Sequence, residues 1–520
     1  MTAADHLAML PIVLPLAAGA ITLLMDERLL GARAAVSLAA TVLLVAVGVT
    51  LIGMVNGSSV IVYRVGDWAA PFGIVLVVDR LSAAMVLLAA VLGLASLVFS
   101  LARWQRAGPR FHSLVQFLLM GVNGAFLTGD LFNLFVFFEV FLTASYGLAL
   151  HGSGLQRVRP GLHYITVNLA ASLLFLIGVS LIYAAAGTLN MADLARQWRE
   201  GLIAHRALYE VGGAILGIAF LAKAGMWPLC FWLPEAYSAS SAPAAALFAV
   251  LSKVGVYAIL RIGTLFLGAD VAASPSPGTP WLVVAGMGTL VFGAVGVLAA
   301  QRLPRLASYS VLVSSGTLLA AVAIGGAALT GAALYYLVVS TLALSAFFLL
   351  VELVERGRKA GADIVAVTAE AFGAEDGDDE NVGMTIEAPI ALLGLAFAAC
   401  AIMLAGLPPF AGFIGKFAML HALLDSDMVS ATSWTMVALL IGSGLTTIIA
   451  MARMGVRRFW TPSDANVPRV RVVEFAPVVF LLALCAALTV PVAPLARYFD
   501  AAAHGLYAPA DYVNRVLSPR

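Results

Sequence analysis

Long apolar runs dominate this 520-residue sequence, in which 62% of the residues are hydrophobic and 11% are charged. A helix needs roughly 17–25 mainly apolar residues to cross a bilayer. Fifteen runs meet or approach that length, and the two at 388–407 and 409–424 are joined only by a Leu-Pro-Pro sequence. We merge these two into one broken helix, because no loop fits between them. The sequence therefore predicts an all-α polytopic membrane protein with about fourteen transmembrane helices.

The predicted spans are 7–25, 34–55, 79–101, 111–128, 131–150, 161–186, 209–232, 242–266, 280–300, 305–328, 331–354, 388–424, 433–455 and 475–495.

Charge and cysteine content exclude several classes of protein. The formal net charge is +1, so nothing indicates nucleic acid or another polyanionic partner. The three cysteines lie far apart in apolar runs, and neither they nor the seven histidines have metal-ligand spacing. The chain also has no iron–sulfur or flavin motif. We therefore expect no metal site, no cofactor and no enzymatic activity of its own.

The basic residues of the loops predict an orientation. Placing the N-terminus outside puts seventeen Arg and Lys residues in inside loops and nine outside. Cytoplasmic loops usually carry the excess of Lys and Arg. We therefore expect both termini outside the membrane. The three remaining basic residues, all lysines, fall within spans and are Lys223, Lys253 and Lys416.

One carboxylate, Glu139, also lies inside a predicted span. An ionised side chain at the centre of a membrane helix costs roughly 2.5–3.5 kcal/mol, so this glutamate and the three lysines would together cost on the order of 10–14 kcal/mol if unpaired. The alternative interpretation is that each forms a structural ion pair, or that the lysines reach the headgroups along the helix. The positions of Lys223 and Lys253, well inside their spans, argue against the second explanation.

Lysine is used at these depths although arginine predominates elsewhere, since only four lysines occur in the chain. A buried lysine can lose its proton near neutral pH, whereas arginine effectively cannot. A pair of Glu139 and Lys223 would act as a proton switch, because moving the carboxylate changes the affinity of the amine for H⁺. The pattern indicates proton transfer within the membrane.

Prolines predict breaks in two spans. Pro228 and Pro234 follow Lys223, and Pro408 and Pro409 precede Lys416. Interrupted helices in corresponding halves of a transporter point to an ion site, although an ordinary proline kink is the alternative. The broken spans are the seventh and the twelfth, which suits two repeats of five helices, spans four to eight and nine to thirteen. The predicted parts of the chain are 1–110, 111–266 (first repeat), 280–455 (second repeat) and 456–520.

Two segments carry a resemblance to a known family. The sequences "TGDLFNLFVFFEV" (128–140) and "AKAGMWPLCFWLPEAYSASSAPAAALFAVLSKVGVYAILR" (222–261) resemble the antiporter-like subunits shared by complex I, membrane-bound hydrogenases and Mrp-type cation/proton antiporters. Within that superfamily they look most like the D subunits of Mrp (also Mnh or Pha) antiporters. The similarity covers nearly the whole chain.

The resemblance implies a subunit of fourteen helices with two inverted five-helix repeats and a central row of hydrated polar residues. It implies that Glu139 and Lys223 form the coupling pair, that Lys253 relays protons, and that Lys416 connects to a second half-channel. It further implies a bacterial inner membrane, partner subunits that are themselves hydrophobic, and Na⁺ or K⁺ exchanged for protons.

The eleventh predicted span departs from the family pattern. That span usually carries a histidine or lysine in the family, but "YYLVVSTLALSAFFLL" (335–350) has neither. Ser340, Thr341 or an ordered water would have to bridge the gap between Lys253 and Lys416.

Three functions stay open from the sequence. The first is proton movement coupled to Na⁺ or K⁺ export in a hetero-oligomeric antiporter. The second is a proton-pumping module of a quinone oxidoreductase or hydrogenase complex, driven by electron transfer in other subunits. The third is a scaffold that holds a transporting partner, which the missing ionisable residue in 335–350 favours and the three deep lysines oppose.

Overall fold

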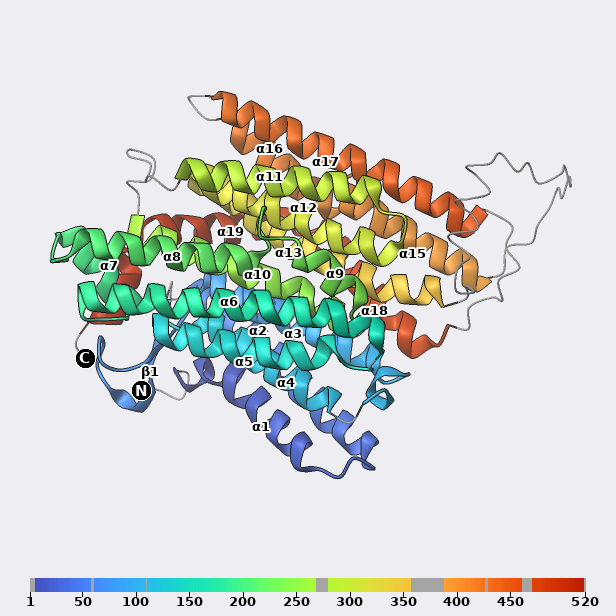
Figure 1. Cartoon of the computed structure of the whole chain (residues 1–520), viewed down its shortest axis with the longest axis horizontal. Helices are drawn as coiled ribbons and strands as arrows, with labels where there is room; N and C mark the ends of the chain where they lie inside the picture. The colour runs from blue at the N-terminus through green and yellow to red at the C-terminus, as the bar shows by residue number, and fades with distance from the viewer. Residues whose placement is uncertain are drawn as a thin grey trace, which may run out of the picture.

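The computed structural model describes residues 5–57, 60–108, 110–152, 154–267, 279–356, 388–425, 429–460 and 470–518. Within these ranges the chain is an elongated bundle of long helices that lie side by side, with both ends of the chain at one end of the bundle (Figure 1). Four basic residues that entered the orientation count fall outside the described ranges, namely Arg358, Lys359, Arg469 and Arg520.

The elements of the first half are η1 (Asp5–Ala8), α1 (Leu10–Leu24), α2 (Leu30–Gly57), β1 (Val60–Arg64), η2 (Val65–Asp67), β2 (Val75–Asp79), α3 (Arg80–Ser100), η3 (Trp104–Arg106), α4 (Phe111–Leu127), α5 (Leu131–Ala149), α6 (Leu155–Ala186), α7 (Met191–Glu200), α8 (Arg206–Ala224), α9 (Trp232–Ala239) and α10 (Ala242–Leu267). Those of the second half are α11 (Thr279–Ala299), α12 (Leu303–Ile324), α13 (Ala327–Glu355), α15 (Ala388–Ala405), α16 (Ala411–Leu424), α17 (Ala431–Gly455), η5 (Val456–Trp460), α18 (Val472–Ala487), α19 (Val492–Tyr507) and α20 (Ala510–Leu517).

The expected polytopic, all-α class is confirmed. Eleven helices of the described chain are long and apolar enough to cross a membrane, or twelve if the bent pair α18 and α19 counts as one span. Helices α1, α4 and α16 are apolar but shorter. Each predicted span overlaps at least one helix, while the count of fourteen stays a prediction.

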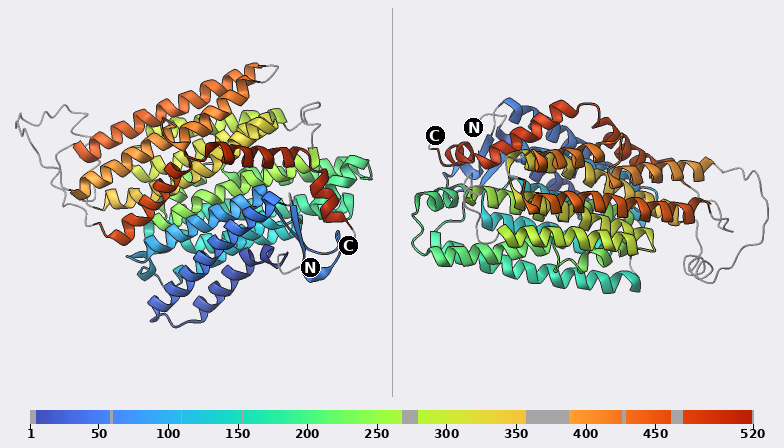
Figure 2. Two further views of the ribbon diagram at one scale, coloured as in Figure 1. Left: turned by 180° about the vertical axis from the view of Figure 1, so that it is seen from behind. Right: turned by 90° about the horizontal axis from the view of Figure 1, so that it is seen from above.

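The last predicted span differs from its expected form. We expected one continuous helix over 475–495, but α18 and α19 are separate and bent by 85° relative to one another. Pro491 precedes α19 and Pro494 lies in its first turn. Because proline has no N–H to donate, a continuous helix could not satisfy its carbonyls here, and the expectation of a straight span was wrong. Figure 2 shows α19 as the dark red helix that crosses the bundle after this bend.

A small β-hairpin is the other element that the helical pattern did not indicate. Strands β1 and β2 pair antiparallel, with Val60 opposite Asp79 and Arg64 opposite Val75. Three of the five residues of β1 and four of the five of β2 are buried, because apolar Val, Ile, Leu and Tyr side chains fill both strands. The hairpin lies at the end of the bundle that carries both termini (Figure 1).

Burial divides the long helices into central and peripheral ones. In the most apolar stretch of each helix, 94% of the residues are buried in α10 and 89% in α13, against 28% in α11 and 39% in α2. Helices α3 and α12 are also mostly buried, at 83% each. A polar side chain on α10, α12 or α13 is therefore surrounded by protein rather than by lipid.

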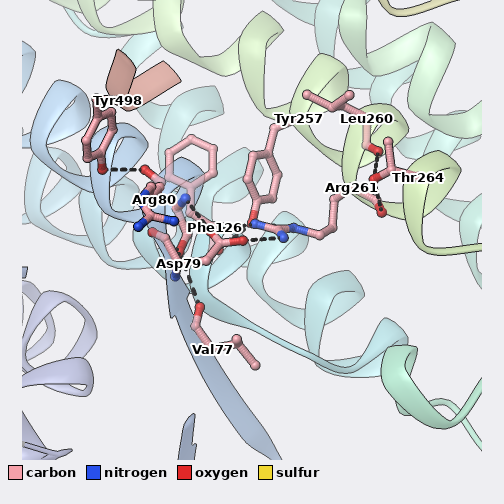
Figure 3. A network of polar contacts seen from close by, with 10 residues as sticks. Val77, Asp79, Arg80, Phe126, Tyr257, Leu260, Arg261, Thr264 and Tyr498 are labelled. Carbon is pink, nitrogen blue, oxygen red and sulfur yellow. Dashed lines mark hydrogen bonds and ion pairs between the residues drawn. The ribbon is translucent and has the colours of Figure 1, made fainter. Parts of the chain in front are cut away.

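An ion pair ties the hairpin end to this centre. Asp79, the last residue of β2, accepts hydrogen bonds from both terminal nitrogens of Arg261 on α10, at 2.5 and 2.8 Å (Figure 3). Asp79 also caps α3, because its carboxylate accepts from the backbone N–H of Ser82. Arg261 is 6% exposed. The orientation count from the sequence had taken Arg261 as one of the nine outside residues, and this was wrong, since Arg261 lies buried within α10.

Two tyrosines complete the network. The Tyr257 hydroxyl donates to the backbone carbonyl of Phe126 at 2.6 Å and accepts from Arg261, one turn further along α10 (Figure 3). Tyr498 of α19 donates to the carbonyl of Arg80 at 2.6 Å. The start of α3, the end of α10 and α19 are thus held by one set of polar contacts.

Candidate functional site

Glu139 and Lys223 meet through a third residue, Ser172. Glu139 lies on α5, Ser172 on α6 and Lys223 in the last turn of α8. The Lys223 ammonium donates to the Ser172 hydroxyl oxygen at 2.9 Å, and that hydroxyl in turn donates a short hydrogen bond to Glu139 Oε1. The structure therefore brings the two predicted residues together as an acid–hydroxyl–amine chain of three side chains.

Ser172 was not among the residues that the sequence pattern indicated. It lies in an otherwise apolar helix, and Asn168, four residues earlier, shares its face of α6 and is also buried. Two polar residues one turn apart in an apolar span are the pattern that could have identified it. Close packing of α6 on α8 brings the serine within reach, because a Cβ at Gly178 would lie only 2.9 Å from the carbonyl oxygen of Gly212.

Lys223 is held at the end of a helix. It is 5% exposed, and its Nζ lies 5.1 Å from the centre of the Phe138 ring. Helix α8 ends at Gly225, whose φ of +71° suits glycine, and the N–H of Met226 returns to the carbonyl of Leu221. A cation near a helix C-terminus is stabilised by the helix dipole, and an aromatic face adds to this.

Pro228 and Pro234 have different positions in the broken seventh span. Pro228 lies in the segment between α8 and α9, whereas Pro234 lies in the first turn of α9. The N–H groups of a first turn have no partner within the helix, so a proline is tolerated there. The break itself follows Lys223 directly.

Lys253 lies in the middle of α10 and is fully buried. Its Nζ donates to the hydroxyl of Ser315 on α12, at 3.1 Å. Ser315 is itself completely buried. The partner of this ammonium is therefore a neutral oxygen on a neighbouring central helix.

Lys416 of α16 is held by backbone carbonyls. Its Nζ lies 2.9 Å from the Ala405 oxygen and 3.5 Å from the Leu404 oxygen, at the end of α15. In an unbroken helix these two carbonyls would accept from the N–H groups of residues 408 and 409, which are both proline. Pro408 and Pro409 thus leave these two carbonyl oxygens without helical N–H donors, and the Lys416 ammonium donates to both instead.

The hydroxyls of α13 differ in where they point. Thr341 donates back to the Leu337 carbonyl of its own helix at 2.6 Å. Ser340 lies 3.0 Å from the hydroxyl of Ser314 on α12 and lines a small cavity together with Leu404. Of the two residues considered for the gap in 335–350, Ser340 is the one that lines this cavity and contacts α12.

Within the described residues, no three His, Cys, Asp or Glu side chains gather closely enough to hold a metal ion.

Together, the bundle and its three buried lysines define a class: polytopic membrane proteins with ionisable groups inside the helix bundle. Residues 128–446 match the family described as "NADH:quinone oxidoreductase/Mrp antiporter, TM". That range is more than half of the chain, so this chain belongs to that family of membrane subunits, and the resemblance of the two motifs is confirmed.

Two named relatives are similar over almost their full length. The D subunit of a probable K⁺/H⁺ antiporter of Rhizobium meliloti is 55% identical, and the match covers 99% of this chain and 98% of the relative. The D subunit of an Na⁺/H⁺ antiporter of Bacillus subtilis is 35% identical, with 99% of both chains covered.

Solved structures agree on the fold. A chain in the structure of the Mrp complex from Dietzia sp. superposes with a TM-score of 0.85 at 27% identity, covering 100% of both chains. A chain of an archaeal membrane-bound sulfane sulfur reductase gives 0.83 at 25% identity, covering 99% of this chain and 100% of that one. A chain of complex I from Thermus thermophilus, at 20% identity and a TM-score of 0.73, shows the same fold.

Proposed function

We propose that this chain is the proton-conducting subunit of a multisubunit Na⁺ or K⁺/H⁺ antiporter, in which it couples proton uptake to cation efflux. The observation that carries the proposal is the chain Glu139–Ser172–Lys223. A hydroxyl can pass a proton by accepting one and donating another. Protonation of Lys223, biased by Glu139, gates the entry of protons into the subunit.

The partners of the other lysines support a relay. Lys253 is held by the Ser315 hydroxyl and Lys416 by two carbonyls. Neutral oxygens stabilise an ammonium without the strong preference for the charged form that a contacting carboxylate would impose. Lys253 then passes protons along the centre, and Lys416 connects to the second half-channel.

The test is exchange driven by ΔpH in vesicles that contain the assembled complex. Glu139→Ala and Lys223→Ala should each abolish cation exchange while the subunit still co-purifies with its partners. Glu210→Gln on the same helix as Lys223 is the matched control, since Glu210 is exposed and pairs with Arg206. Normal exchange in either assembled site variant contradicts the mechanism.

The chain is further proposed to contain an N-terminal part (1–110), two inverted repeats (111–266 and 280–455) and a C-terminal part (456–520). Each repeat contains one broken helix next to a lysine, with Lys223 before its break and Lys416 after the other. Interrupted helices in corresponding halves of the chain are typical of transporters built from such repeats. The proposal keeps fourteen spans.

The proposed location is the bacterial inner membrane, with both termini outside. The excess of basic residues in inside loops supports this orientation. Cysteine labelling with a membrane-impermeant reagent at each terminus would test it.

A second candidate is a proton-pumping module of a redox complex, favoured by the similarity to a sulfane sulfur reductase chain. Co-purification with iron–sulfur subunits would support it, whereas co-purification with only hydrophobic membrane subunits supports the antiporter.

A scaffold role predicts wild-type exchange activity of the complex after Lys223, Lys253 and Lys416 are all replaced by Met.

A further inference from the structure

A small cavity lies beside Lys416, where α12, α13, α15 and α17 meet. Five hydroxyl side chains line it, together with Leu404, whose carbonyl oxygen lies 3.5 Å from Lys416 Nζ. The cavity leaves about 10 Å³ for the centre of a water-sized particle. That is close to the smallest space that holds one water molecule. The hydroxyls belong to Ser310, Ser314, Tyr336, Ser340 and Thr447.

These hydroxyls present acceptors to the cavity. Ser310 donates to the Leu306 carbonyl at 2.9 Å, and Thr447 donates to the Ser443 carbonyl at 2.7 Å. A serine or threonine hydroxyl has one proton and two lone pairs, so a proton used on the helix backbone leaves lone pairs for the cavity. Ser340 likewise donates to a carbonyl of its own helix, at 3.3 Å, and lies 3.0 Å from Ser314.

The broken helix leaves two carbonyl oxygens beside Lys416, and one of them belongs to Leu404, which lines the cavity. The oxygens of Leu404 and Ala405 lack helical N–H donors because of Pro408 and Pro409. Helix α16 approaches this end closely, since a Cβ at Gly412 would lie 2.2 Å from the Met403 oxygen. Backbone carbonyls at the end of a half-helix are groups that coordinate alkali cations in transporters. Among the described residues that line the cavity there is no carboxylate.

We propose that this cavity binds one dehydrated monovalent alkali cation, and that the cation and the protonated form of Lys416 exclude one another. The inference rests on the antiport function proposed above and adds a place for the cation. Five hydroxyls line a space the size of one water molecule, which a K⁺ ion nearly matches, and the side chains of Val313, Leu344 and Met403 complete its wall. Two positive charges this close in a medium of low dielectric constant repel strongly, so cation entry favours loss of the Lys416 proton.

The cation and the Lys416 proton exclude one another because both forms of the site use the same carbonyl oxygen. When Lys416 is protonated, its Nζ donates hydrogen bonds to the carbonyl oxygens of Ala405 and Leu404. When the proton leaves toward the second half-channel, the carbonyl of Leu404, which lines the cavity, becomes available to the cation. One site thus holds either a proton on Lys416 or a cation in the cavity.

Other ionisable groups lie on the described helices around Lys416. Helices α13, α15 and α17 pack on α16, and the ionisable side chains of these four helices, besides Lys416, are Tyr335, Tyr336, Glu352, Glu355, Cys400, His421 and Arg453. Glu352 and Glu355 form ion pairs with arginines at the end of α13 and in η5. The Tyr335 hydroxyl and the Arg453 guanidinium donate to backbone carbonyls elsewhere. Tyr336 lines the cavity, and a tyrosine hydroxyl keeps its proton at neutral pH. Lys416 is therefore the group whose charge changes there.

The test uses the complete complex in vesicles and measures ΔpH-driven exchange against cation concentration. We expect the double variant Ser314→Ala, Ser340→Ala to raise the apparent KM for the cation at least tenfold, and Thr447→Val to raise it in the same direction. The matched control is Thr341→Val, next to Ser340 but bonded to its own helix, which should leave KM unchanged. In the wild type, KM should also rise as the pH falls, because protonated Lys416 competes.

A binding measurement tests the site without transport. Radioactive rubidium, as an analogue of K⁺, should bind saturably to the purified wild-type complex and to Thr341→Val, and this binding should be lost in the double variant. If the double variant does not assemble, the KM and the rubidium binding of Thr447→Val test the proposal by themselves.

Two outcomes overturn the inference. Unchanged KM and unchanged rubidium binding in the assembled cavity variants would show that no cation binds there. Slower exchange at unchanged KM would mean that the cavity holds only a water bridge between Lys253 and Lys416. Both outcomes leave the proposed function standing if Glu139→Ala and Lys223→Ala still abolish exchange, so the two failures are distinguishable.

Discussion

The hydroxyl of Ser172 stands between Glu139 and Lys223, donating to the first and accepting from the second. In this geometry Glu139 and Lys223 do not contact one another directly. Either side chain can therefore gain or lose a proton without the two having to move apart. The serine also fixes the distance between α5 and α8 across α6. Because the three side chains come from three helices, movement of any one helix would change these hydrogen bonds.

Removing the bridging hydroxyl should slow transport. Ser172→Ala takes away hydrogen bonds to two charged groups, each worth roughly 1.5–3 kcal/mol, so we expect exchange to fall about tenfold or more. Ser180→Ala, on the same helix, removes an exposed hydroxyl that bonds to the Leu176 carbonyl and should have little effect. Initial rates of ΔpH-driven exchange are the measurement. Equal rates in both variants would show that Ser172 is only structural.

Replacing Lys253 by arginine separates a proton carrier from a fixed charge. Arginine keeps the positive charge but does not release its proton. We therefore expect Lys253→Arg to assemble and to lose most of its exchange activity. Near-normal rates in the assembled variant would show that the charge alone is needed, and that protons do not pass through this amine.

Asp79 should contribute strongly to stability. Asp79→Asn leaves the buried guanidinium of Arg261 without its carboxylate, and breaking a buried pair in this way costs about 3–5 kcal/mol. The change should lower the unfolding temperature of the detergent-solubilised protein. Glu210→Gln, which breaks an exposed pair with Arg206, should change stability by about 1 kcal/mol or less.

This contribution should depend on pH. Burial by itself raises the pKa of Asp79, but the Arg261 guanidinium and hydrogen bonds from Arg261 and Ser82 outweigh it, so the pKa lies below the ordinary value of 3.8. A carboxyl with a lowered pKa stabilises the fold above its unfolded-state pKa, and the stabilisation is lost as the pH falls through the folded-state value. The difference between wild type and Asp79→Asn should thus be full at neutral pH and shrink below about pH 4. A constant difference down to pH 3 would contradict this assignment.

Gly412 should tolerate no side chain. The Cβ of Gly412→Ala would meet the Met403 carbonyl at 2.2 Å, so α16 would have to move away from the end of α15 and carry Lys416 with it. We expect lower thermal stability and weaker exchange. Gly442→Ala on α17 is the control, because nothing lies within 4 Å of the added atom and alanine favours a helix by about 1 kcal/mol over glycine. Unfolding temperatures of the two variants give the comparison.

Much of the architecture was predictable because it depends on local pattern. Membrane helices need long apolar stretches, so the positions of the spans followed from composition along the chain. The prolines before Lys416 marked a broken helix, and α15 and α16 are separated there. The bend between α18 and α19 was missed although Pro491 and Pro494 lie inside the apolar run. The apolar pattern predicted a span there, but the missing N–H groups of the two prolines interrupt the helix.

The sequence by itself determined that Lys223 and Lys253 are buried, because a long apolar run leaves a charged group within it little access to bulk water. It did not reveal that Arg261 is buried as well. The tertiary structure alone decided which oxygens these charges meet. Ser172, Ser315 and the carbonyl of Ala405 belong to other helices or to the far side of a break, and their contacts depend on how the helices cross. Helix crossing is set by the packing of many side chains, so no short stretch of sequence encodes it.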